Sequence, residues 1–170
     1  MKYDRYFLEN VHNDIKADMA AIGLVPHYRN GNLLTLPQNS YDCDFCARRY
    51  WRKNDMALIE MTKGSYNYSC LEVRVTNNRL YISIWFGEHH KKDKLILSSR
   101  KNDIIDKRNE YTEYKWVDEN GTLAPTDEKL IQWLCEPGHE TVFRKELTSY
   151  NRDDVVSEMK HLKEYLDVLL

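Results

Sequence analysis

Two stretches of strict apolar and polar alternation, separated by a pair of asparagines, constrain the fold of this chain more than any other feature. Residues 70–75 and 79–86 alternate with the period of a strand, and Asn77 and Asn78 tolerate the positive φ angles of a two-residue hairpin turn. That turn sets three aliphatic pairs on one face, which are Val75 and Leu80, Val73 and Ile82, and Leu71 and Ile84. A slip by one residue would turn the whole set toward water, so the pattern predicts one register.

The opposite face of this hairpin is amphipathic. It carries Glu72, Arg74, Tyr81, Ser83 and Trp85. Arg74 stands directly across from Tyr81, where a guanidinium can lie on the phenol ring. We therefore expect this face to combine charge with aromatic surface.

Helical periodicity predicts a helix at each end of the chain. Apolar residues recur every three or four positions over 3–22, and Gly23 follows where a helix commonly ends in a left-handed residue. The same spacing returns over 155–169, with Asn151 or Asp153 as the N-cap. A helix therefore flanks the hairpin on either side in sequence.

Weaker patterns complete the predicted fold. One short internal helix is predicted to begin at Thr126 and to end at Pro137 and Gly138. The segment 41–53 fits either a short helix or a loop, and the charged segment 91–106 is predicted to be mobile. Further strands are predicted over 33–36, 56–61, 94–98, 111–117 and 141–147. The expected fold is α+β, an antiparallel sheet of about five or six strands with the N- and C-terminal helices packed on it. No repeat or linker divides the chain, so 1–170 reads as a single domain.

Charge and composition narrow the function. The 25 basic and 27 acidic residues leave a net charge of -2, which argues against coating nucleic acid because that task needs a broad basic excess. No apolar run approaches the roughly 18 to 20 residues of a membrane span, and the first residues lack the apolar core of a signal peptide. We expect a soluble protein of the cytoplasm, with its four cysteines as thiols or metal ligands.

One cysteine pattern approaches the spacing of a metal site. Cys43 and Cys46 form a Cys-x2-Cys pair, and Cys135 with His139 supplies two further ligands of the kind that hold one structural zinc. The competing interpretation is that these cysteines are small buried side chains, since nothing in the sequence brings the two halves together.

A basic and aromatic segment gives a nucleic-acid hypothesis. Cations and flat rings alternate in Arg48, Arg49, Tyr50, Trp51, Arg52 and Lys53. Such a run suits a single strand, because cations bind phosphates and bases stack on rings. The alternative is that the rings face the core while the cations face water.

The motifs of common enzyme classes are absent from the sequence. There is no phosphate-binding glycine loop, nucleophile elbow or His-Glu-x2-His motif. Asp55, Glu60 and Lys63 come closest to a metal-dependent nuclease, but Glu60 and Lys63 would point to opposite faces of a strand. The segment 88–90, Glu-His-His, reads as a solvated loop. These observations argue against catalysis and leave a metal-dependent hydrolase or nuclease as the second alternative.

Abundant aromatic residues without a catalytic motif favour a binding role. Our leading hypothesis is a small non-catalytic binding or inhibitory protein that engages a macromolecular partner, most simply a protein. Its expected contact residues are Arg74, Tyr81, Trp85, Tyr114 and Trp116. The first alternative is a nucleic-acid-associated domain that uses 48–53. The composition suits a protein of bacteria or their mobile elements that acts on a host protein.

Overall fold

The computed structural model describes residues 3, 5–26, 28–29, 32–33, 49–53, 70–87 and 91–170. Its elements follow one another along the chain as α1 (Arg5–Ala21), β1 (Leu24–Pro26), β2 (Tyr28–Arg29), β3 (Asn32–Leu33), β4 (Arg49–Lys53), β5 (Cys70–Thr76), β6 (Arg79–Phe86), α3 (Lys91–Ser98), α4 (Lys101–Glu110), β7 (Lys115–Asp118), α5 (Asp127–Cys135), β8 (Thr141–Leu147) and α6 (Arg152–Leu169).

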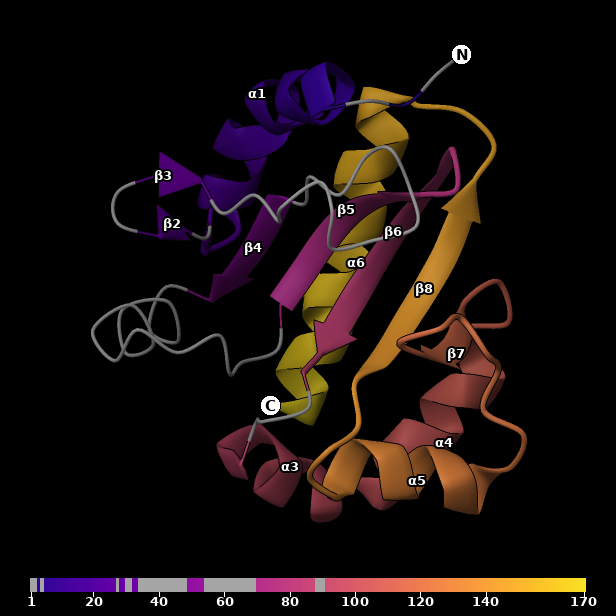
Figure 1. Cartoon of the computed structure of the whole chain (residues 1–170). Helices are drawn as coiled ribbons and strands as arrows, with labels where there is room; N and C mark the ends of the chain where they lie inside the picture. Colours follow the sequence, from indigo (N-terminus) through magenta and orange to yellow (C-terminus); the bar gives the residue numbers. More distant parts are fainter. Residues whose placement is uncertain are drawn as a thin grey trace.

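An antiparallel sheet forms the centre of the molecule (Figure 1). Strands β5, β6, β8 and β7 lie side by side in that order, and β4 and then β1 continue the sheet beyond β5. Strands β2 and β3 pair separately. The α+β class and the antiparallel sheet with both terminal helices packed on it are confirmed.

The predicted hairpin is confirmed in its turn and its register. Asn77 and Asn78 have φ angles of 51° and 55°, and β5 pairs with β6 as the aliphatic pattern requires. All six aliphatic side chains of that pattern are buried. The hydrophobic alternation was sufficient here because only one register buries every member of the set.

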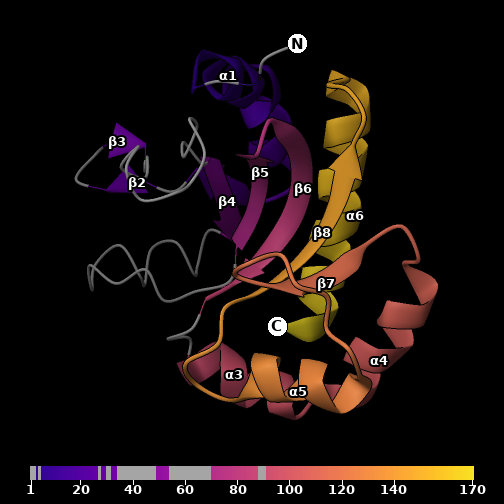
Figure 2. The same cartoon turned by 45° about the vertical axis from the view of Figure 1, so that its right-hand side comes forward.

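The terminal helices cover the aliphatic side of the sheet, which we call the helical face. Helix α6 packs across β5 and β6, while α1 contacts β1, β4 and α6 (Figure 2). The apolar stripes of both helices join the core through Leu8, Val11, Ile15, Met19, Val155, Met159, Leu162 and Leu166. Each such side chain contributes roughly 1.5–3 kcal/mol by leaving water, which makes this face the main source of stability.

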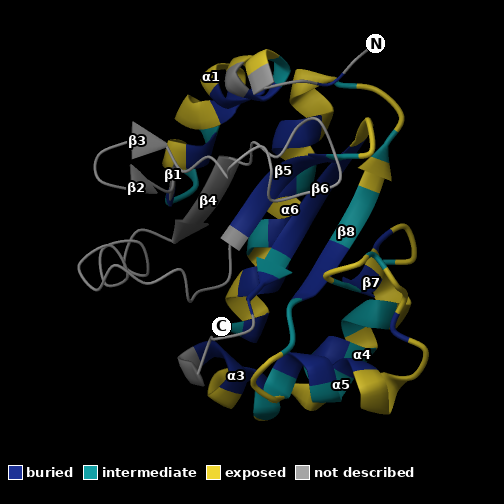
Figure 3. Ribbon diagram, in the orientation of Figure 1, coloured by how far each residue is buried: buried dark blue, intermediate teal, exposed yellow. Residues whose placement is uncertain are grey.

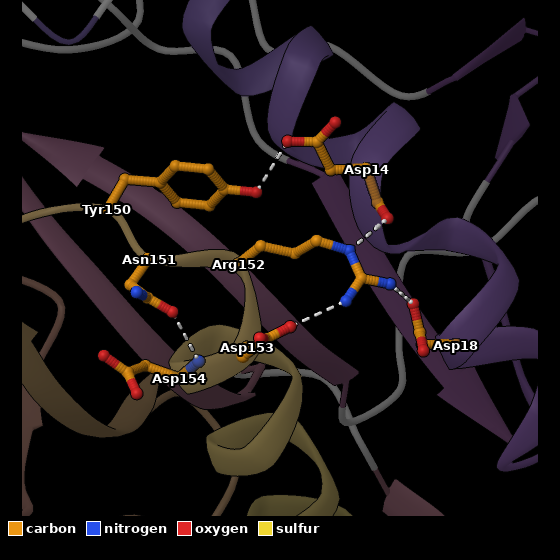
Figure 4. A network of polar contacts seen from close by, with 7 residues as sticks. All are labelled: Asp14, Asp18, Tyr150, Asn151, Arg152, Asp153 and Asp154. Atoms are coloured by element: carbon orange, nitrogen blue, oxygen red, sulfur yellow. Dashed lines mark hydrogen bonds and ion pairs between the residues drawn. The ribbon is translucent and has the colours of Figure 1, made fainter.

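The predicted C-terminal end of α1 and the predicted N-cap of α6 are confirmed. Gly23 follows α1 with a φ of 82°, and the Asn151 side chain caps α6 by accepting a hydrogen bond of 3.1 Å from Asp154 N. Polar contacts then join the start of α6 to α1 (Figure 4). Tyr150 Oη donates to Asp14 Oδ2 at 2.9 Å, and Arg152 donates to Asp14 O at 3.3 Å and pairs with Asp18. These groups are largely exposed, so they orient the helices more than they stabilise them.

The segment after β6 corrects two predictions. Residues 94–98 belong to α3 rather than to a strand, and α3 and α4 occupy the charged region that was expected to be mobile. Contacts with residues far away in sequence stabilise α3 here. The buried ammonium group of Lys94 donates to Trp133 O at 3.0 Å and to His139 O at 3.2 Å, which fixes α3 against the end of α5. Short apolar runs do not distinguish helix from strand by themselves.

The sheet edge and the internal helices differ from expectation as well. Of the strand predicted over 111–117, only β7 is extended, because Tyr111 to Tyr114 forms a turn closed by a 3.1 Å bond between their backbone groups. Within the described residues, three internal helices stand where one was predicted, although Thr126 does cap α5 as expected. Two further predicted strands, over 56–61 and for most of 33–36, lie outside the described residues. The end of the segment 41–53, which was predicted as a short helix or a loop, is strand β4.

Candidate functional site

The second side of the sheet, which we call the polar face, brings together side chains from four strands. Strand pairing aligns Glu72, Ser83, Arg144 and Lys115 in one row across the sheet, and Arg74, Tyr81 and Glu146 in the next. Trp85 lies on the same face in a third row with Val142 and Val117. Directly paired residues project to the same side, so these rows form one surface.

A buried carboxylate lies at the β5 side of the polar face. Glu72 and Ser83 have no exposed surface, and Ser83 Oγ donates a 3.0 Å hydrogen bond to Glu72 Oε1. The same oxygen lies 3.8 Å from Arg74 Nη1, while Arg74 Nε donates to Thr76 Oγ1 at 3.1 Å. Glu72 Oε2 has no hydrogen-bond partner among the described residues. The charge of this carboxylate is therefore compensated mainly by Arg74.

Arg144 occupies the centre of the polar face. Its guanidinium carbon lies 4.4 Å from the centroid of the Tyr81 ring, a diagonal contact between β8 and β6. The turn after β7 approaches it closely: a Cβ atom at Gly121 would lie 3.1 Å from Arg144 Nη2. Glycine at this position, with a φ of 82°, keeps that space open. The ring and the turn together hold the guanidinium in place.

The charges on this face do not all pair. Arg74 lies beside Glu72, and Arg79 Nη1 lies 3.3 Å from Glu146 Oε2. Arg144 makes no ion pair or side-chain hydrogen bond with any described residue. Burial lowers the pKa of Arg144 most, and Arg74 and Arg79 lower it further, whereas Tyr81 and the nearby carboxylate of Glu146 raise it. Arginine stays charged under all ordinary conditions, so this partly buried cation has no described carboxylate within ion-pair distance.

In the two rows of the polar face that begin at Glu72 and Arg74, exposure increases from β5 toward β8 and β7. Glu72 and Ser83 are fully buried, and Arg74 and Tyr81 are each 8% exposed. Trp85 and Arg144 are half-buried, and Lys115 is exposed. Figure 3 shows the same change from β5 to β8. The accessible part of the polar face therefore lies around Arg144.

Tyr114 and Trp116, which were predicted as contact residues, lie in the core. They are 6% and 3% exposed, and their ring centroids lie 4.9 Å and 4.5 Å from that of Phe143 on the helical face. Tyr114 Oη also donates to Glu158 on α6. Arg74 and Tyr81 do face one another across β5 and β6, but the guanidinium on the Tyr81 ring is that of Arg144.

The other predicted sites are only partly described. Arg48, Cys43, Cys46, Asp55, Glu60, Lys63 and residues 88–90 lie outside the described residues, and the nucleic-acid and zinc hypotheses stay predictions. Strand β4 pairs Tyr50 with Glu72 and Trp51 with Leu71. Cys135 ends α5 half-buried, and burial raises the pKa of its thiol. The described ranges contain no group of three or more His, Cys, Asp or Glu side chains that could hold a metal ion.

Sequence reasoning missed Arg144, Arg79 and Glu146. Residues 141–147 were predicted as a strand, and Arg144 occupies one of its polar positions. Its importance follows from the pairing of β8 with β6, which places it beside Ser83 and Tyr81. Four elements separate these strands in sequence, so no local pattern specifies the pairing.

The arrangement defines an α+β protein with a charged, partly open sheet face. Comparison with protein-family models, with curated proteins and with solved structures finds no match to this chain. Within the described segments, no helix is both long and apolar enough to cross a membrane.

Proposed function

We propose that this protein is a non-catalytic binding protein that engages a protein partner through the accessible part of the polar face. The observation that carries the proposal is Arg144, a partly buried guanidinium that lies over the Tyr81 ring and makes no ion pair with any described residue. Arginine and tyrosine dominate the energetics of protein interfaces. A side chain that is already ordered loses less conformational entropy on binding.

Neighbouring side chains support the same surface. Lys115 stands beside Arg144 on β7 and is exposed, while the half-buried Trp85 adds apolar area two residues from Ser83. Arg79 and Glu146 form an exposed ion pair at the rim. A charged rim around an ordered aromatic and arginine centre is the usual composition of a protein interface.

Site-specific photocrosslinking in cells that produce the protein tests this proposal. A photoreactive amino acid at Lys115 should form an adduct with a defined protein, whereas the same group at the exposed Lys160 on α6 should not. The partner, once identified and purified, should bind the wild-type protein and lose affinity for Arg144→Ala. Equal adducts at both positions, or no adduct at Lys115, would contradict the proposal.

A further inference from the structure

Resting on the proposed function, we infer that the partner presents an acidic segment whose aspartate or glutamate carboxylate pairs with the Arg144 guanidinium. A guanidinium offers its N–H donors in a planar fork that matches a carboxylate in a two-bond arrangement. The guanidinium carbon lies over the Tyr81 ring, and the N–H donors of Arg144 make no side-chain hydrogen bond or ion pair with any described residue, so they are available for such a pair.

The fixed position of Arg144 favours a specific ligand over general charge attraction. Tyr81 lies under the guanidinium, and the turn that contains Gly121 lies beside it. That turn is itself closed by the Asp118 carboxylate, which accepts hydrogen bonds from Asn120 N at 2.9 Å and Thr122 N at 2.8 Å. Because these contacts restrict the side chain before binding, a carboxylate meets a largely preorganised donor.

The local balance of charge selects a short acidic segment over nucleic acid. Among the side chains that the structure describes on this face, Arg74 and Arg79 already face carboxylates, so the guanidinium of Arg144 and the exposed Lys115 beside it are available to an incoming anion. A phosphate backbone binds through a track of several cations, and the exposed carboxylate of Glu146 would interrupt such a track. One or two carboxylates match the available positive charge.

Selection of random peptides displayed on phage against the full-length protein tests this inference. Enriched peptides should share one Asp or Glu position, and their synthetic copies should bind Arg144→Ala about thirtyfold or more weakly than wild type. Arg144→Lys should recover little affinity, because an ammonium group keeps the charge and loses the planar fork. Arg100→Ala is the matched control and should leave the affinity unchanged, since Arg100 is exposed, pairs with Asp103 on α4 and lies outside the polar face.

Amidation of the shared carboxylate completes the test. Asp→Asn or Glu→Gln in the peptide should lower its affinity for the wild-type protein about as much as Arg144→Ala lowers the affinity for the unchanged peptide. Combining the two changes should lower the affinity little further. Peptides that depend on Arg144 but share no carboxylate would overturn this inference and leave the proposed function standing. Peptides that ignore Arg144, or the failure to enrich any, would overturn both. If single-stranded DNA bound more tightly than the peptides and its binding depended on Arg144, the inference of an acidic partner would be overturned.

Discussion

The helical face and the polar face alternate along the same strands, yet their buried side chains make different kinds of contact. On β8, Phe143 packs against rings from β7 and α6, whereas its neighbour Arg144 lies over one ring and makes no ion pair with any described residue. Nonpolar burial stabilises a fold in proportion to the area removed from water, and an unpaired cation adds little. The comparison indicates that the helical face maintains the fold while the polar face retains capacity for binding.

Phe143→Ala should produce the largest loss of stability and tests the role of the helical face. Phe143 is fully buried among Tyr114, Trp116 and Tyr165, so its removal should cost about 3–5 kcal/mol of unfolding free energy. Chemical denaturation measures this loss, with Arg144→Ala on the same strand as the matched control. Similar losses for the two variants would abolish the distinction between the faces.

Ser83→Ala should produce the next largest effect and tests the sealed part of the polar face. It removes the hydrogen bond to Glu72 Oε1 at a site with no exposed surface, which should cost about 1–3 kcal/mol. The exposed Ser99, which follows α3 and whose hydroxyl donates to Ile96 O in that helix, is the control and should change little when replaced by alanine. An unchanged denaturation midpoint for Ser83→Ala would show that Glu72 does not depend on this donor.

Asn151→Ala should cost about 1 kcal/mol through the lost cap of α6. Arg152→Ala, which removes the exposed ion pairs with Asp18 and Asp153, should cost less, about 0.2–1 kcal/mol. Denaturation of the two single variants compares a capping bond with a surface ion pair at adjacent positions. A larger loss for Arg152→Ala would mean that the contacts between α1 and α6 contribute more than their exposure implies.

Acid should weaken the link between β8 and α6 by a smaller amount. Burial opposes the charge of Glu158, but hydrogen bonds from Lys145 and Tyr114 outweigh it and hold the pKa of Glu158 below its usual 4.5. Because the pKa is lower in the folded state, this stabilisation is present above the unfolded value and is lost as pH falls through the folded one. Glu158→Gln should therefore flatten the acid side of the stability profile measured by denaturation. An unchanged slope would remove Glu158 from the acid response.

The predictable parts of the fold were those in which one local pattern excluded the alternatives. The register of β5 and β6 followed from six aliphatic residues, and the two terminal helices from long apolar stripes. Helix α3 was missed because Lys94 is buried by contacts with Trp133 and His139, which are far away in sequence. The same limit applies to the site: Tyr81 was predicted, whereas Arg144 gained its meaning only from the pairing of β8 with β6.

Tyr114 and Trp116 show why aromatic abundance alone misplaces a surface. Both alternate correctly for one face of a strand, but the choice between the helical face and the polar face depends on the partner strand β8. Pairing of Trp116 with Phe143 places these rings toward α6, and they become part of the core. The candidate surface therefore rests on Tyr81, Trp85 and Arg144.

The most direct test of the account measures stability and partner affinity together for Arg144→Ala, using the partner identified by crosslinking. The account predicts unfolding free energy within about 1 kcal/mol of wild type, because a single cation–π contact is lost. It predicts a fall in affinity of about thirtyfold or more. An unchanged affinity in a folded variant would contradict the assignment of the binding face, and a loss of several kcal/mol in stability would place Arg144 among the residues that hold the fold.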